Sequence, residues 1–260
     1  MFNSTLKLSN RLPNALLSLL LAVVCVLPVA KAKAANLETL TAAEDIGILS
    51  QSIVKNYFYL GENLNASRSS QKLKEHIQTI DASLATLKSS SVAAKIEDDL
   101  MFIEVIWADL KDTLAQEYTR DTGLLVVDMG EVLLEGSENI ANALYDNDIQ
   151  KSGMIDIIEH QRYLIERMAK LYIISIAGFK DFNVVKQTNN TVQTFDEGLA
   201  KIESNSYPEQ VSKKVERLRK RWDSSRTFYL NVQEGDLPRT IFFNTEMIER
   251  LLEDIFDHHK

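Results

Sequence analysis

The chain has 260 residues, of which 45% are hydrophobic and 25% are charged, and this balance argues against a disordered protein and a multi-span membrane protein. Nine glycines and four prolines are few for this length and disfavour a β-sandwich or barrel, which needs many tight turns. The net charge of −8 becomes −12 for residues 35–260, because the first 34 residues carry four basic and no acidic side chains. The strong negative charge of residues 35–260 repels nucleic acid, so no nucleic-acid partner is expected.

Residues 1–34 have the features of an export signal that is cleaved off. Lys7 and Arg11 precede the apolar run 15–29, which is shorter than the roughly 20 residues of a membrane-spanning helix. The small residues within 30–34 suit a signal peptidase, so we expect cleavage at the end of this segment. An uncleaved N-terminal anchor is the alternative. We therefore expect a protein exported across the inner membrane and soluble in the periplasm after cleavage.

Cys25 is the only cysteine, and it lies inside the predicted signal. The mature protein would then have no disulfide, no thiolate nucleophile, no zinc–cysteine site and no covalently attached haem.

A comparison of the body with itself indicates an internal duplication. One shift, of 115 residues, aligns the two halves without gaps, and both tryptophans, Trp107 and Trp222, occupy the same position in this register. The same shift aligns further identical pairs: Leu49 and Leu164, Lys55 and Lys170, Tyr57 and Tyr172, Asp81 and Asp196, Glu131 and Glu246, Glu138 and Glu253. A tandem repeat therefore predicts two domains after the signal, residues 35–148 and 149–260.

Within each copy the apolar residues recur every three or four positions, which is the period of an amphipathic helix. Each copy has four such apolar stripes. In the first copy they cover about 46–60, 77–87, 92–116 and 124–145, and in the second copy about 164–172, 192–202, 208–233 and 237–258. No segment alternates with period two over a useful length. The expected fold is all-α, with two tandem antiparallel four-helix bundles, and the sequence leaves open whether they lie side by side or end to end.

The sequence carries no recognisable catalytic or metal-binding motif. None of the four histidines has a glutamate three positions before it, as a ferritin-like metal site requires. Asp156 and His160 lie one helical turn apart, and a surface ion pair explains them better than a metal site. There is no Gly-x-Ser-x-Gly elbow, no phosphate loop and no glycine-rich dinucleotide fingerprint. We expect no enzyme, no metal and no cofactor.

The segment 160–172 resembles the opening helix of the PilJ/NarX-like sensor domain. That family forms the N-terminal periplasmic domains of type IV pilus methyl-accepting chemotaxis transducers and of nitrate/nitrite sensor kinases. The second copy retains the family's Gln-Arg pair, leucine, second arginine and Met-Ala-Lys-x-Tyr run, whereas the first copy has Gly47 and Ser52 in place of the two arginines. The resemblance extends over both repeats. The chain is also similar to secreted members of the family, which have two such domains and no signalling output.

The resemblance implies a ligand site on this helix. In the nitrate sensors an arginine of the helix captures an anion at a dimer interface, and the matching residue here is Arg162. Gln161, Arg167 and Lys170 are further candidate ligand-binding residues. A guanidinium suits this task because its planar donors match a planar oxyanion or a carboxylate.

The helical wheel places Arg162 among isoleucines, on a face distinct from the core stripe of its own bundle. This position indicates a second buried contact, so one hypothesis is an internal pseudo-dimer in which Arg162 faces the small residues of 43–54 across a cavity. The alternative is that Arg162 pairs with Glu166 one turn away.

Two function classes follow from these features. The favoured one is a non-enzymatic periplasmic sensory or ligand-binding module that binds a small anion and presents its bound state to a membrane-bound sensor or chemoreceptor. The other is a helical scaffold or adaptor that binds protein and no small ligand. Its sequence support is the contrast between the basic run 213–221 and the acidic run 97–104, which occupy the third helices of the two copies and would attract each other or a second molecule.

Overall fold

A computed structural model of the whole chain describes residues 14–145, 153–179, 182–231 and 237–259, with side chains from residue 37 onward except at 182. Within these ranges the chain forms eight α-helices, one short 3₁₀ turn and no strand, which confirms the predicted all-α fold. The helices are α1 (Asn14–Gly61), α2 (Ala66–Ser89), α3 (Glu97–Leu114), α4 (Arg120–Tyr145), α5 (Gly153–Ile176), α6 (Phe182–Ser204), α7 (Glu209–Leu230) and α8 (Pro238–His259).

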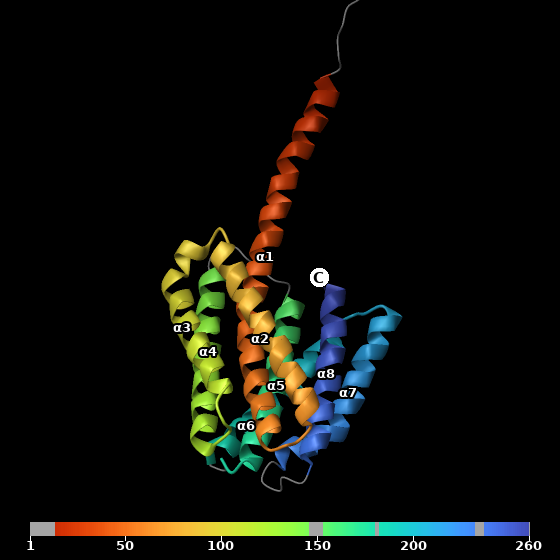
Figure 1. Cartoon of the computed structure of the whole chain (residues 1–260). Helices are drawn as coiled ribbons and strands as arrows, with labels where there is room; N and C mark the ends of the chain where they lie inside the picture. Colours follow the sequence, from red (N-terminus) through yellow and green to blue (C-terminus); the bar gives the residue numbers. More distant parts are fainter. Residues whose placement is uncertain (1–13, 146–152, 180–181, 232–236, 260) are drawn as a thin grey trace, which may run out of the picture.

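Helix α1 is much longer than the others, and its N-terminal part projects beyond the rest of the molecule (Figure 1). The predicted cleavage point at residue 34 falls within this helix, and the basic residues Lys7 and Arg11 lie outside the described residues. Cleavage therefore stays a prediction. Among the helices searched in the described part of the chain, none is sufficiently long and apolar to cross a membrane.

The helices form two groups of four, and the duplication relates one group to the other. Helices α1 to α4 contact one another in a ring, and so do α5 to α8. Equivalent residues make equivalent bonds: the indole of Trp107 donates to Asp81 over 2.7 Å, and that of Trp222 donates to Asp196 over 2.6 Å. The predicted boundary at 148 lies in a segment outside the described residues.

The two groups lie side by side, because the equivalent first helices α1 and α5 pack against each other (Figure 1). The hydrophobic core crosses this contact, since Leu171, Ile173 and Phe242 of the second group belong to the same buried cluster as the α1 side chains. The rings of Tyr59 and Phe242 meet with centroids 4.8 Å apart. A shared core makes the relative position of the two groups part of the fold.

The ends of the third helices differ from the predicted ones. A 3₁₀ turn, Ala93–Lys95, precedes α3, so this helix begins at Glu97 and not near residue 92. In the second copy the helix begins one residue after the start of the predicted stripe at 208, because Pro208 is the N-cap of α7, with an extended ψ of 151°. In the fourth helix of the second copy, by contrast, Pro238 is the first helical residue, where its missing N–H costs nothing.

The predicted attraction between the two third helices does not bring them together within one chain. Helices α3 and α7 lie at opposite ends of the row of helices (Figure 1). Much of the basic run is neutralised locally, since Lys214 pairs with Asp254 and Arg219 pairs with Glu203.

Candidate functional site

The four predicted ligand-binding residues all lie on α5, but their side chains point to three different neighbours. Gln161 is buried against α6, where a Cβ added to Gly198 would lie 2.1 Å from its Nε2 atom. Arg162 lines a pocket between the two copies. Arg167 and Lys170 reach towards α4 of the first copy. The structure therefore does not gather the four residues into one site.

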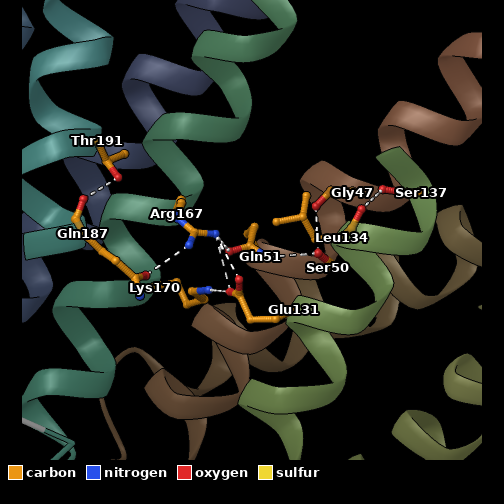
Figure 2. A network of polar contacts seen from close by, with 10 residues as sticks. All are labelled: Gly47, Ser50, Gln51, Glu131, Leu134, Ser137, Arg167, Lys170, Gln187 and Thr191. Atoms are coloured by element: carbon orange, nitrogen blue, oxygen red, sulfur yellow. Dashed lines mark hydrogen bonds and ion pairs between the residues drawn. The ribbon is translucent and has the colours of Figure 1, made fainter. Parts of the chain in front are cut away.

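Arg167 and Lys170 take part in a polar network that joins the two copies (Figure 2). The ammonium of the buried Lys170 forms an ion pair with Glu131, and Nη1 of Arg167 lies 3.2 Å from the same carboxylate. Burial alone would raise the pKa of Glu131, but the charges of Lys170 and Arg167 outweigh it and hold that pKa below its ordinary value. Arg167 also donates to Gln187 on α6 over 3.0 Å. Both cations therefore have ion-pair partners within the protein, and their contacts with Glu131 connect the two copies.

Arg162 lies in a different place, a pocket of about 330 Å³ that we call the polar pocket. It opens between α1 and α2 of the first copy and α5 and α8 of the second. Its lining consists of Asp45, Leu49, Arg68, Lys72, Glu75, His76, Thr79, Arg162, Glu246, Glu249, Arg250 and Glu253.

The environment of Arg162 differs from both sequence expectations. Glu166 is not its partner, because the buried carboxylate of Glu166 binds the Lys55 ammonium at 2.7–2.8 Å. The small face of α1 is not opposite Arg162 either: it packs on α4, where a Cβ on Gly47 would lie 2.6 Å from Oγ of Ser137.

The guanidinium of Arg162 has little to hold it within the protein. It lies over the ring of Phe256, 5.8 Å from the centroid. Its Nε is buried and makes no hydrogen bond within the described residues. Arg162 is therefore a cation in a pocket between the copies, with donor capacity left over.

Two titratable side chains of the polar pocket have strongly shifted pKa values. His76 is buried, with 8% of its surface exposed, and burial lowers its pKa to about 4. Burial and the charge of Glu166 raise the pKa of Glu249 to about 7. Sequence reasoning missed both residues. The signal was present for His76, which continues the apolar stripe of Leu73 and Ile80 at helical spacing and so had to face the core.

The pocket is also crossed by an ion pair between the copies. Nε of Arg68 on α2 lies 2.7 and 2.8 Å from the two carboxylate oxygens of Glu246 on α8. Glu246 is the repeat equivalent of Glu131, so each copy uses this position to bind a cation of the other copy.

A second pocket, of about 320 Å³, lies between α1, α4 and α5, and we call it the acidic pocket. Its lining consists of Glu44, Gly47, Ile48, Leu134, Ser137, Glu138, Ala141, Tyr145, Asp156, Glu159, His160 and Tyr163. Glu44, Asp156 and Glu159 place one oxygen each within 4.8 Å of one another.

The acidic pocket changes the interpretation of Asp156 and His160. The hydroxyl of Tyr145 donates to Asp156 over 2.9 Å and lies 3.1 Å from Glu44. His160 packs against the ring of Tyr163. Among the described residues Asp156 and His160 form no ion pair with each other, so the predicted surface pair is wrong. Asp156 instead accepts the hydrogen bond of Tyr145, and burial lowers the pKa of His160.

The geometry of the polar pocket suits binding. Its side chains carry positive and negative charges and include hydrogen-bonding groups. They lie on four helices that a shared core holds in place. Comparison of the chain with protein-family models, with curated proteins and with solved structures finds no match. The functional inference therefore depends on the pocket and on the residues of α5.

Proposed function

We propose that the protein is a non-enzymatic, exported ligand-binding module of the PilJ/NarX-like sensor type, whose ligand-binding site is the polar pocket. Arg162 anchors an anionic group of a small ligand there, and the bound state is presented to a membrane signalling partner. The observation that carries this proposal is the buried, unbonded Nε of Arg162 in a pocket between the two copies. A guanidinium in such a place gains most from a ligand that completes its hydrogen bonds.

The position of the pocket supports a sensory role. Its walls come from both copies, so a ligand that touches α5 and α8 on one side and α1 and α2 on the other stabilises one relative placement of the two groups. A partner protein that contacts both groups would detect that placement.

The test is a thermal scan of the purified protein against nitrate, nitrite and small carboxylates, which include plain ones such as propionate and ones that also carry an amine. A ligand that binds only the folded state raises the melting temperature by mass action. We expect a rise with at least one of these anions and its loss in Arg162→Ala, while Arg217→Ala, an exposed arginine of α7, keeps it. The absence of any rise across the whole series would reject the proposal. Cell fractionation combined with N-terminal sequencing tests the export step, for which we expect a mature chain that starts near residue 35.

A second candidate function is a protein-binding scaffold, and one observation favours it. Met101, Phe102 and Val105 on α3 are each more than half exposed and lie at helical spacing, whereas the repeat equivalents on α7 are Glu216, Arg217 and Lys220. An exposed apolar face on the third helix of one copy, where the other copy has charged residues, is typical of an interaction surface. If it serves that purpose, Phe102→Glu abolishes binding to a purified partner and leaves the anion response unchanged.

A further inference from the structure

We propose that the ligand of the polar pocket is a zwitterion of amino-acid size, with a carboxylate that Arg162 binds and a cationic amine that Glu249 binds. This inference rests on the proposed function, because it takes the polar pocket as the ligand site. It goes beyond that function by naming the ligand class and a second binding residue.

The charge of the lining argues against a plain anion. Four side chains of the pocket are Arg or Lys, and five are Asp or Glu. A bare anion would therefore enter a lining without net positive charge, and a bare cation would approach four like charges. A molecule that carries both signs is the ligand that such a lining attracts.

The charges that remain after internal pairing are also of both signs. Glu246 is occupied by Arg68, and Glu75 lies 3.6 Å from Lys72. Arg162 keeps an unbonded Nε, and the half-buried Glu249 lies in the same lining, where burial and the charge of Glu166 disfavour its ionised form. These two groups come from neighbouring helices of the second copy, α5 and α8, which pack against each other.

The duplication allows the same two positions to be compared in both pockets. The repeat equivalent of Arg162 is Gly47, and that of Glu249 is Leu134, and both of these line the acidic pocket. The same pair of positions therefore carries a guanidinium and a carboxyl in one pocket, and neither in the other. Anion capture alone requires only the guanidinium, so the added carboxyl needs another explanation. A half-buried carboxyl whose ionised form is disfavoured gains from a cationic neighbour, and a ligand ammonium in the polar pocket would supply that charge.

The volume limits the size of the ligand. A pocket of about 330 Å³ has room for roughly eleven water molecules at about 30 Å³ each. This is the low end of the range of small-molecule sites. An amino acid and a few waters fit in this space.

The experiment compares matched probes on the purified full chain by thermal scan and calorimetry. The zwitterions are glycine, L-alanine, L-serine and L-glutamine. Propionate lacks the amine of alanine, and ethylammonium lacks its carboxylate. We expect at least one amino acid to raise the melting temperature, by about 5–10 °C at a concentration roughly 100-fold above its Kd. Propionate and ethylammonium at the same concentration leave it unchanged.

Two variants separate the two ends of the ligand. Arg162→Gln and Glu249→Gln each weaken amino-acid binding at least tenfold. The exposed residues Arg217 and Glu216 on α7 provide the matched controls, since Arg217→Gln and Glu216→Gln keep the wild-type affinity. Circular dichroism confirms that each variant is folded before binding is measured.

The outcomes distinguish this inference from the proposed function. If propionate or nitrate binds as tightly as the amino acids, and Glu249→Gln has no effect on binding, the anion site stands and the zwitterion is rejected. If neither the anions nor the amino acids bind, both proposals are rejected.

Discussion

The polar and acidic pockets occupy positions that the duplication relates, and yet their chemistry differs. Four positions are common to both linings: Asp45 and His160, Gly47 and Arg162, Leu134 and Glu249, Glu138 and Glu253. Only the last pair is identical. Among the described residues, the lining of the acidic pocket has no Arg or Lys, whereas that of the polar pocket has four.

The difference at Gly47 and Arg162 shows how one repeated helix serves two purposes. Gly47 has no side chain, so α4 approaches α1 closely, with Ser137 nearly touching the glycine. At the equivalent place on α5 the long side chain of Arg162 lines the polar pocket and lies over Phe256 of α8. If Arg162 binds the ligand as proposed, the duplicated scaffold keeps that arginine in one copy and uses the equivalent position of the other copy for packing.

The largest expected effect comes from the two equivalent lysines, Lys55 and Lys170. Lys55→Met removes the partner of the fully buried Glu166 and should cost about 3–5 kcal/mol of unfolding free energy. Lys170→Met should cost less, because its partner Glu131 is 39% exposed and water can reach it. Urea unfolding measures both.

The double variant Lys55→Met/Glu166→Met is the control for this comparison. It removes both buried charges and should recover most of the lost stability. A double variant as unstable as the single one would show that packing, and not the unpaired carboxylate, causes the loss.

The next prediction concerns Glu249, whose pKa of about 7 in the folded protein exceeds the ordinary value of 4.5. The folded state therefore holds a proton that the unfolded state releases between pH 4.5 and 7, so this residue lowers stability as pH rises through that window. Glu249→Gln should be more stable than the wild type above pH 7, by up to about 3 kcal/mol, and equal to it below pH 4.5. Unfolding curves at pH 4 and pH 8 check the sign, and an equal gain at both values would contradict it.

His76 should act in the opposite direction and by a similar amount. Its pKa falls from 6.5 to about 4 on folding, so the unfolded state binds the extra proton. Stability from this residue is complete above pH 6.5 and is lost as the pH falls to 4, by up to about 3 kcal/mol. His76→Leu should flatten the acid limb of the stability profile, and His258→Leu, on an exposed histidine, should not. An unchanged acid limb in His76→Leu would rule the histidine out as its source.

The smallest effect tests the close packing at the acidic pocket. Gly47→Ala places a Cβ 2.6 Å from Oγ of Ser137, and we expect a loss of about 1–3 kcal/mol in spite of the better helix propensity of alanine. Gly153→Ala, with no atom of the described residues within 4 Å of the added Cβ, is the matched control. Ser137→Ala in the Gly47→Ala background should restore part of the loss, and no restoration would place the clash elsewhere.

Much of the architecture was predictable because helical packing leaves a periodic record. The stripes and the register of 115 residues located the helices of the body, and the aligned Trp107 and Trp222 turn out to make equivalent bonds to the aligned Asp81 and Asp196. Helix ends were less predictable. The 3₁₀ turn before α3 depends on local backbone conformations that apolar periodicity does not encode.

The site was predictable only in part. Arg162 was singled out from its motif and its isoleucine neighbours, and it does line a pocket between the copies. Arg167 and Lys170 were grouped with it because they share a helix. They follow Arg162 by five and eight positions, so they lie on another side of the helix and contact Glu131. Glu249 had no signal in the sequence, since a glutamate in an amphipathic helix is ordinarily solvated.

The sequence by itself therefore determined the all-α class and the repeated four-helix unit. Each helix must bury one apolar face, and this requirement fixes the spacing of the apolar residues within that helix. Only the tertiary structure decided that α1 packs on α5 and which charges meet there. Contacts such as Lys55 with Glu166 and Arg68 with Glu246 join residues 111 and 178 positions apart, and they depend on the relative placement of two complete bundles. No periodicity within one helix carries that information.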